Sequence, residues 1–166
     1  MNDKSRETLL EDQAGRVIKA AAKAGIMVTC AESCTGGMVT AALTDIAGAS
    51  AVLDRGFVTY SNAAKTDLLG VDEAILNAHG AVSPQTAYAM ATGALKAAPN
   101  AHLAVSITGI AGPGGGSAEK PVGLVYFGCA VRGGTTATRK CQFDGDRAAI
   151  RQQAAMFALT LIDENI

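Results

Sequence analysis

The stretch IMVTCAESCTGGMVTAALTDI at residues 26–46 decides the fold class. Its first part, residues 26–31, is a short β-type run, and residues 38–46 show a helical pattern that ends at Gly48. The six residues between them, ESCTGG, join the expected strand directly to the expected helix. A strand that passes into a helix in this way is the repeating unit of a parallel α/β sheet.

The rest of the chain continues this alternation. Before the stretch, apolar residues from Leu10 to Ala21 recur at helical spacing until Gly25. After it we expect strands over residues 56–60 and 102–107, helices that start near Ser61, Asp72 and Ser83, a hairpin over residues 122–143, and a last helix capped by Asp144 or Asp146. The order predicts a single domain over residues 1–166, a three-layer α/β/α fold with a mixed, mainly parallel sheet of about five strands.

Composition excludes several classes of protein. The 166 residues carry a formal net charge of −1 and only four Phe, three Tyr and no Trp, which gives no basic or aromatic surface for nucleic acid. The chain lacks an apolar run long enough for a membrane span, and its N-terminal segment lacks a signal-peptide core. The four cysteines form no CxxC pair and no metal-ligand spacing, so we expect free thiols, a cytoplasmic protein and no metal site. No GxGxxG motif supports a dinucleotide fold, and we expect no organic cofactor.

Charge is unevenly distributed along the chain. Between Ala74 and Ala118 the only formal charge is Lys96. Such a region belongs to the interior, to an interface between subunits, or to a pocket lined by hydroxyls and backbone amides. Together with the apolar hairpin, it favours a homodimer or another homo-oligomer.

Three clusters of polar residues follow the three expected parallel strands. In open α/β sheets, ligands bind beyond the carboxyl ends of such strands, so these clusters should meet at one edge. The first cluster is Glu32, Ser33, Cys34, Thr35, Gly36 and Gly37; the second is Tyr60, Ser61, Asn62 and Lys65; the third is Thr108, Gly109, Ile110, Ala111, Gly112 and Pro113. They bring together a hydroxyl, a phenol, an amine and two glycine-rich turns.

The ESCTGG turn has two interpretations. A serine between a strand and a helix lies near free backbone N–H groups and the positive end of the helix dipole, where an oxyanion or a phosphate can bind. Taken alone, the motif favours the plainer interpretation, in which Ser33 or Thr35 is an N-cap and the glycines allow close packing.

A nucleophilic serine also needs a base. His79 and His102 are expected at the wrong end of the sheet, whereas Lys65 follows a strand at the right end. By itself Lys65 is more often a solvated helix lysine. Cys34 is a rival nucleophile, because a thiol at a helix N-terminus has a lowered pKa, although a small buried residue is the preferred interpretation.

The glycine-rich segment from Gly109 to Gly123 contains six glycines. It is no P-loop, since no GK[ST] follows at the required spacing and the segment leads to a strand. It indicates a close approach of backbone to a ligand or a subunit, or simply a mobile surface turn.

Several motifs together resemble the C-terminal domain of the competence/damage-inducible CinA family, and most closely its stand-alone form. They are TCAESCTGG at 29–37, GFVTYSNAAKTDLLGV at 56–71, HGAVS at 79–83, SITGIAGPGGGSAEKPVG at 106–123 and FDGDRAAIRQQA at 143–154. One departure is Gly114, where the family pattern leads us to expect Thr or Asp.

The resemblance implies an amidase that converts nicotinamide mononucleotide to nicotinic acid mononucleotide and ammonia, with a Ser–Lys site and a nearby tyrosine. Ser33, Lys65 and Tyr60 fall on those motif positions. The substrate-binding groups are then expected among Cys34–Gly37, with backbone N–H groups holding the oxyanion, and Thr108–Gly112. The phosphate is expected at the helix N-terminus or the Thr108–Gly112 turn, with Arg147 as a weaker candidate. The alternative is a non-catalytic module that binds a nucleotide.

Overall fold

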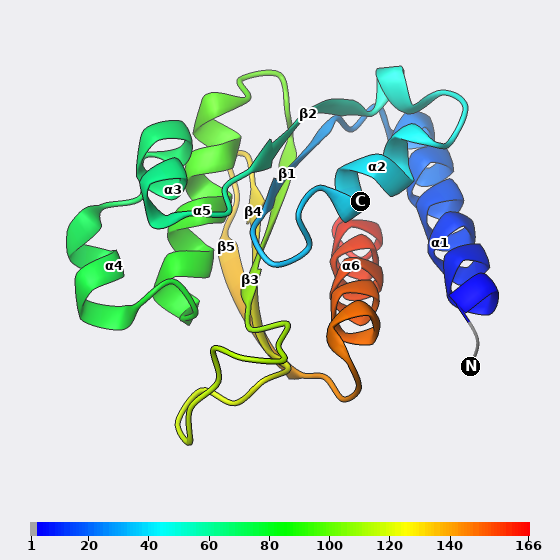
Figure 1. The fold of residues 1–166 in the computed structure, drawn as a ribbon. Helices are drawn as coiled ribbons and strands as arrows, with labels where there is room; N and C mark the ends of the chain where they lie inside the picture. Colours follow the sequence, from blue (N-terminus) through cyan, green and yellow to red (C-terminus); the bar gives the residue numbers. More distant parts are fainter. Residues whose placement is uncertain (1–2) are drawn as a thin grey trace.

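A five-stranded sheet in the order β2-β1-β3-β4-β5 forms the centre of the computed structural model, which describes residues 3–166 and side chains from Thr8 onward (Figure 1). Residues 1 and 2 of the expected domain lie outside the described residues. In chain order the elements are α1 (Asp3–Ala24), β1 (Val28–Glu32), α2 (Met38–Thr44), η1 (Ala49–Ala51), β2 (Leu53–Val58), α3 (Asn62–Leu69), α4 (Glu73–His79), α5 (Pro84–Ala97), β3 (Leu103–Gly109), β4 (Leu124–Val131), β5 (Thr136–Gln142) and α6 (Arg147–Asp163).

Strand directions confirm the mixed, mainly parallel sheet. β1 pairs in parallel with β2 on one side and with β3 on the other, while β4 is antiparallel to both β3 and β5. Glu32, the last residue of β1, is level with Val58 and Ile107, so three strands end at the same edge. β2 begins three residues earlier than the expected Gly56 and ends before Tyr60.

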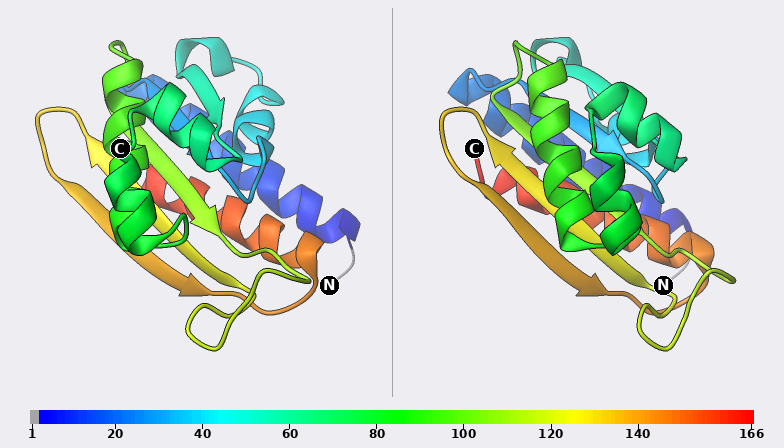
Figure 2. Two further views of the ribbon diagram at one scale, coloured as in Figure 1. Left: turned by 60° about the vertical axis from the view of Figure 1, so that its left-hand side comes forward. Right: turned by 90° about the vertical axis from the view of Figure 1, so that its left-hand side faces the viewer.

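The helices cover both faces of the sheet, as the alternation predicts. α3, α4 and α5 lie on one face, and α1, α2 and α6 lie on the other (Figure 2). Side-chain caps set several boundaries: Ser61 Oγ accepts from Ala64 N at 3.0 Å to begin α3, and Asp146, not Asp144, accepts from Ala149 N at 2.8 Å to begin α6. Over residues 3–166 no helix combines the length and apolar character needed to cross a membrane.

Small residues let α5 lie directly on the sheet. Ser106 Oγ on β3 donates to the Ala87 carbonyl of α5 at 2.6 Å and accepts from Gly128 N on β4 at 3.1 Å. A Cβ atom at Gly128 would stand 2.4 Å from that same carbonyl, so only glycine fits. The 33 alanines and 19 glycines of the chain are therefore partly explained by this close contact of helix and sheet.

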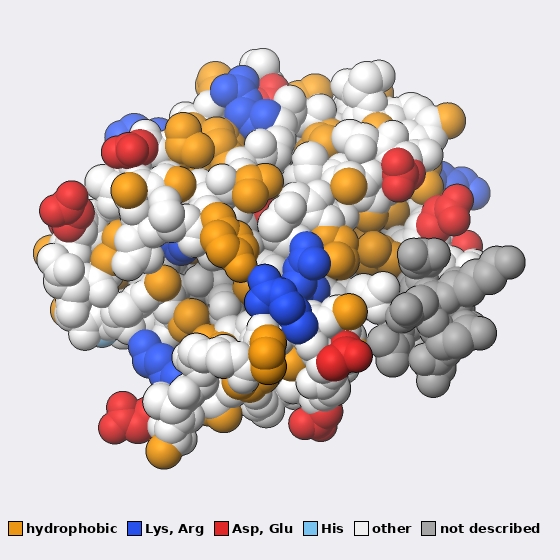
Figure 3. Space-filling model, in the orientation of Figure 1, with side chains coloured by type: hydrophobic (Ala, Val, Ile, Leu, Met, Phe, Trp, Pro, Cys, Tyr) orange, Lys and Arg blue, Asp and Glu red, His pale blue; other side chains and the backbone are white. Residues whose placement is uncertain are grey.

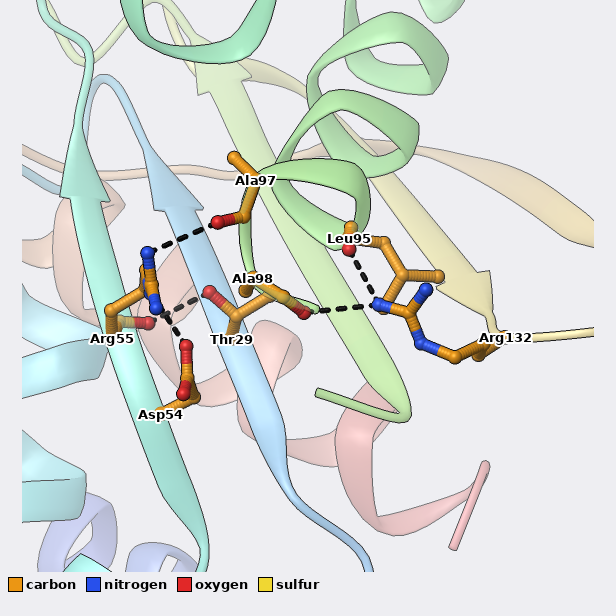
Figure 4. A network of polar contacts seen from close by, with 7 residues as sticks. All are labelled: Thr29, Asp54, Arg55, Leu95, Ala97, Ala98 and Arg132. Atoms are coloured by element: carbon orange, nitrogen blue, oxygen red, sulfur yellow. Dashed lines mark hydrogen bonds and ion pairs between the residues drawn. The ribbon is translucent and has the colours of Figure 1, made fainter. Parts of the chain in front are cut away.

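Two arginines stabilise the C-terminal end of α5, at the sheet edge opposite to the three polar clusters. Arg55 on β2 donates to the Ala97 carbonyl at 3.0 Å, and Arg132 after β4 donates to the carbonyls of Leu95 at 2.6 Å and Ala98 at 3.0 Å (Figure 4). Cations at these carbonyls also complement the negative end of the helix dipole. This edge of the sheet thus serves to hold α5 in place.

Candidate active site

A cavity of about 280 Å³ lies at the carboxyl ends of β1, β2 and β3. It is lined by Ser33, Cys34, Tyr60, Lys65, Ala81, Val82, Thr108, Gly109, Ile110, Ala111, Gly112, Gly114, Gly115 and Arg147. No carboxylate is among these lining side chains. Larger hollows of about 560, 550 and 430 Å³ occur along α6, between α3 and α5 and beside α2. Among the described residues, the hydroxyls that line them, those of Thr92 and Thr160, donate to backbone carbonyls and not to a basic side chain. The smaller cavity is therefore the candidate site.

Ser33 and Lys65 form a buried pair in this cavity. The Lys65 ammonium nitrogen lies 3.1 Å from Ser33 Oγ and donates to the Thr59 carbonyl at 2.8 Å. Lys65 belongs to the first half of α3 and is only 1% exposed, and Ser33 is 8% exposed. Burial lowers the pKa of Lys65, because a charged ammonium loses its hydration there. A lysine with a lowered pKa can lose its proton and accept one from the serine hydroxyl.

Tyr60 lies at the mouth of the cavity and faces Arg147 rather than the Ser–Lys pair. Its side chain is 61% exposed, and its hydroxyl accepts from Arg147 Nη2 at 2.9 Å. Arg147 Nη1 donates to the Gly112 carbonyl at 2.8 Å. One guanidinium therefore joins the segment after β2 to the glycine-rich segment after β3.

The turn after β1 differs from the expected helix N-terminus. α2 begins only at Met38, five residues after Ser33. The N–H groups at its N-terminal end already donate to an anion of the chain itself. The buried Glu32 carboxylate accepts from the backbone N–H groups of Gly37, Val39 and Thr40 at 3.0, 3.1 and 2.8 Å, and from Thr40 Oγ1 at 2.8 Å. The expectation that this helix end anchors a phosphate is wrong, because a carboxylate of the chain fills the place.

Cys34 does not have the environment of a reactive thiol. Burial raises its pKa to about 11, an effect larger than those of the neighbouring charges. The thiol therefore stays protonated near neutral pH, whereas a helix N-terminus would have lowered its pKa. The interpretation of Cys34 as a small buried residue fits this environment.

Two arginines at the beginning of α6 hold the segments around the cavity. Arg147 was only a weak candidate from the sequence, and Arg151 was missed. Arg151 donates from Nε to the Cys34 carbonyl at 3.1 Å and from Nη2 to the Thr35 carbonyl at 2.8 Å. Lys and Arg side chains gather near the centre of the face in Figure 3, close to where α6 begins. The spacing of the two arginines, four residues apart on one helix face, was the available signal.

The glycine-rich segment closes the opposite side of the cavity. Thr108 Oγ1 donates to the Ala81 carbonyl at 2.7 Å, which joins this segment to the connection between α4 and α5. At Gly109 a Cβ atom would lie 2.6 Å from Val125 Cγ2, so the close approach to β4 requires glycine. Residues 113–119 are exposed, and Gly114 and Gly115 reach the cavity from this exposed part.

Comparison with known proteins identifies the family. The family model described as the CinA C-terminal domain matches residues 10–166. The chain belongs to the CinA C-terminal domain family. This CinA domain is 63% identical over 143 residues to "Nicotinamide-nucleotide amidohydrolase PncC" of Enterobacter agglomerans, with 86% of the chain and 87% of the relative covered. It is 56% identical over 150 residues to the protein of the same name from Escherichia coli K12, covering 90% and 88%.

Solved structures agree with the fold of this CinA domain. The crystal structure of competence/damage inducible protein CihA from Agrobacterium tumefaciens superimposes with a TM-score of 0.89 at 52% identity, and the superposition covers 92% of each chain. The resemblance found in the sequence is thereby confirmed, and so is the fold class.

The CinA domain brings most of the expected site residues together, but not all. Ser33, Cys34, Tyr60, Lys65 and the whole Thr108–Gly112 segment line the cavity. Thr35, Gly36 and Gly37 are not among the lining residues, and the N–H groups of Gly36 and Gly37 donate within the turn, to Ser33 O at 3.0 Å and to Glu32. Of the expected oxyanion donors, this leaves the N–H groups of Cys34 and Thr35.

Proposed function

We propose that this CinA domain hydrolyses the carboxamide of nicotinamide mononucleotide to nicotinic acid mononucleotide and ammonia, a step of pyridine-nucleotide salvage. The observation that carries the proposal is the buried Ser33–Lys65 pair, with 3.1 Å between Oγ and Nζ. The names of the PncC relatives, at 56% and 63% identity, supply the substrate class. A nucleotide-binding module without catalysis would need neither a buried lysine nor its serine partner.

The first half of the proposed reaction forms an acyl-enzyme. Ser33 Oγ attacks the carboxamide carbon while unprotonated Lys65 Nζ accepts the hydroxyl proton. The tetrahedral intermediate then collapses, the carbon–nitrogen bond breaks, and Lys65 returns the proton to the departing ammonia. An ester between Ser33 and the pyridine carbonyl remains.

The second half releases the acid. Water attacks the ester carbon, Lys65 takes a proton from the water, and the bond to Ser33 Oγ breaks as that proton passes to the serine oxygen. The products are a carboxylic acid and the free enzyme, so atoms and charge balance without any other reactant. The hydrogen bond from Lys65 to the Thr59 carbonyl supports both halves, because it holds the amine beside Oγ.

The oxyanion of the intermediate needs fixed donors. We assign this role first to the N–H of Cys34, the residue that follows the nucleophile and lines the cavity. Among the hydrogen bonds between described residues, the N–H groups of Cys34 and Thr35 donate to no oxygen, so neither has to give up a carbonyl partner to bind the oxyanion.

The substrate phosphate is assigned to the side of the cavity formed by Arg147 and the Thr108–Gly112 turn. The lining contains this guanidinium and backbone amides but no carboxylate, which suits an anion. Tyr60 acts in this proposal by positioning Arg147, its hydrogen-bond partner at 2.9 Å, or by relaying a proton once substrate is bound.

The setting of the enzyme is also part of the proposal. Free thiols at all four cysteines fit a reducing compartment, so we place the protein in the cytoplasm. We further propose one amidohydrolase domain over residues 1–166 and a homodimer, which light scattering after gel filtration tests directly.

The decisive test is ammonia release from nicotinamide mononucleotide by the wild-type protein and by Ser33→Ala, Lys65→Ala and Cys34→Ala. Loss in the first two variants and retention in the third is expected. Full activity in Ser33→Ala contradicts the serine mechanism, and loss confined to Cys34→Ala transfers the role to the thiol. Saturable binding of the nucleotide by the wild type without turnover would favour the non-catalytic module.

A further inference from the structure

The turn that carries Ser33 is held by two groups of opposite charge, one directly before the turn and one on α6. The carboxylate of Glu32 binds the N–H groups at the end of the turn and the beginning of α2. The guanidinium of Arg151, on α6, binds the carbonyls of Cys34 and Thr35 at 3.1 and 2.8 Å. Glu32 therefore holds backbone N–H groups of this turn and of the start of α2, and Arg151 holds backbone carbonyls of the same turn.

Arg151 determines the orientation of peptide groups next to the nucleophile. Because a trans peptide is planar, fixing its carbonyl also fixes the N–H on the opposite side. Three consecutive carbonyls have partners: Ser33 O accepts from Gly36 N at 3.0 Å, and Arg151 binds the next two. The N–H of Cys34 belongs to the Ser33 peptide, which Gly36 N holds, and Arg151 holds the two peptides that follow.

The part of α6 that carries Arg151 is firmly packed, and Arg151 itself does not line the cavity. Its neighbours on α6, Ile150, Ala154 and Ala155, are buried, so the helix cannot shift easily. Arg147, one turn earlier, lines the cavity, whereas Arg151 does not. Arg151 therefore acts on the turn rather than on the substrate. Its planar guanidinium binds the two carbonyls from two separate nitrogens in a fixed plane, whereas a lysine would have to bind both from one nitrogen.

We propose that Arg151 is a positioning residue that holds the Ser33 turn in its reactive geometry. The inference rests on the proposed function, because it assigns Arg151 to the acyl-transfer step of that reaction. A displacement of about 1 Å in a reacting group can cost roughly 100-fold in rate, so losing this contact should be visible in kcat.

The first experiment compares Arg151→Ala and Arg151→Lys with Arg139→Ala, a control at an exposed arginine of β5. For Arg151→Ala we expect kcat to fall about 10- to 100-fold while KM stays within about threefold. Arg151→Lys should recover part of the loss, and Arg139→Ala should resemble the wild type. Millimolar guanidinium chloride should restore activity to Arg151→Ala, and potassium chloride at the same concentration should not.

A second measurement does not depend on the substrate. The rate at which a fluorophosphonate probe labels Ser33, followed by intact mass, should fall in Arg151→Ala as kcat does. A wild-type protein that is labelled but releases no ammonia would contradict the proposed function, and the labelling rates of the variants would still decide the role of Arg151.

Three results would overturn the inference. The first is wild-type kcat and labelling in folded Arg151→Ala. The second is a loss of activity in Arg151→Ala that follows its unfolded fraction, measured by circular dichroism, and is not rescued by guanidinium. If the alanine variant does not fold, the same measurements on Arg151→Lys decide whether Arg151 positions the turn. The third is a wild-type protein that neither reacts with the probe nor releases ammonia.

Discussion

Two glycine-containing segments face each other across the cavity, and they are held in different ways. The turn at residues 33–37 is mostly buried, and its peptide groups are bound by Glu32 and Arg151. The segment at residues 110–122 is exposed over residues 113–119 and is attached at a few points, among them Gly112 O to Arg147 and Lys120 Nζ to His79 O at 2.7 Å. The difference teaches that the turn with the proposed nucleophile is held along its length by buried side chains, whereas the segment at residues 110–122 is held mainly at its ends.

The largest effect should come from the base of the buried pair. Because burial lowers the pKa of Lys65, the neutral amine forms at a lower pH than in an exposed lysine, and kcat/KM should rise with pH as that proton is lost. Lys65→Arg should reduce kcat/KM by roughly 10³-fold at every pH, because a guanidinium keeps its proton. A pH series of ammonia release measures both, and a flat wild-type profile would contradict the role of Lys65.

The next largest effect should come from the buried carboxylate of Glu32, which holds the turn at residues 33–37. Glu32→Gln places an amide NH₂ where the carboxylate accepts backbone N–H groups, so we expect a loss of about 2 kcal/mol in the free energy of unfolding. The turn should also loosen, which lowers kcat about 10-fold or more. Urea unfolding and steady-state kinetics measure the two effects. Glu119→Gln, in the exposed segment, is the matched control, and equal stability of the two variants would show that Glu32 does not hold the turn.

A smaller effect is expected on the exposed segment. Lys120→Met removes the hydrogen bond to the His79 carbonyl at the C-terminal end of α4, so the segment should become more mobile. KM should then rise about three- to tenfold while kcat stays within about twofold. The exposed Lys140→Met on β5 serves as the control. A fall in kcat with constant KM would mean that the two segments are not held differently.

The smallest effect concerns the thiols. Iodoacetamide should modify Cys141 first, because it is only half-buried, and should leave buried Cys34, with its raised pKa, largely unmodified. Activity should survive the modification of Cys141. Peptide mass mapping beside the ammonia assay checks this, and rapid labelling of Cys34 would show that the turn opens to solvent.

Local signals in the sequence predicted most of the fold. Ser83 followed by Pro84 marked the start of α5 correctly, and Gly25 and Gly70 marked helix ends, because caps and left-handed glycines act within a few residues. The expected end of the second helix at Gly48 was wrong, because α2 already ends at Thr44 and Gly48 instead begins η1. The start of β2 was missed, because an edge strand with exposed residues such as Arg55 lacks the apolar run that reveals a buried strand.

The site was predictable where a residue directly follows a strand, as Ser33 and Thr108 do. The side chains that hold the turn at residues 33–37 could not be predicted in this way. Glu32 looked like one more polar residue of the turn, yet its carboxylate fills the helix end that was one of the two places expected for the phosphate. Arg151 is separated from Cys34 by 117 positions, and no local pattern connects them. Such contacts depend on how α6 packs against the sheet, which is decided by the whole core.

The buried Lys65 has a consequence for how the chain takes up protons. The formal charge of −1 counts this lysine as a cation. Between its lowered pKa and the ordinary value of 10.5, the unfolded chain binds a proton that the folded chain does not. Folding in that window therefore releases a proton, and the folded state gains stability as pH rises through it, whereas below the window the buried charge disfavours folding. The same side chain that serves as the proposed base is thus a thermodynamic link between acidity and folding.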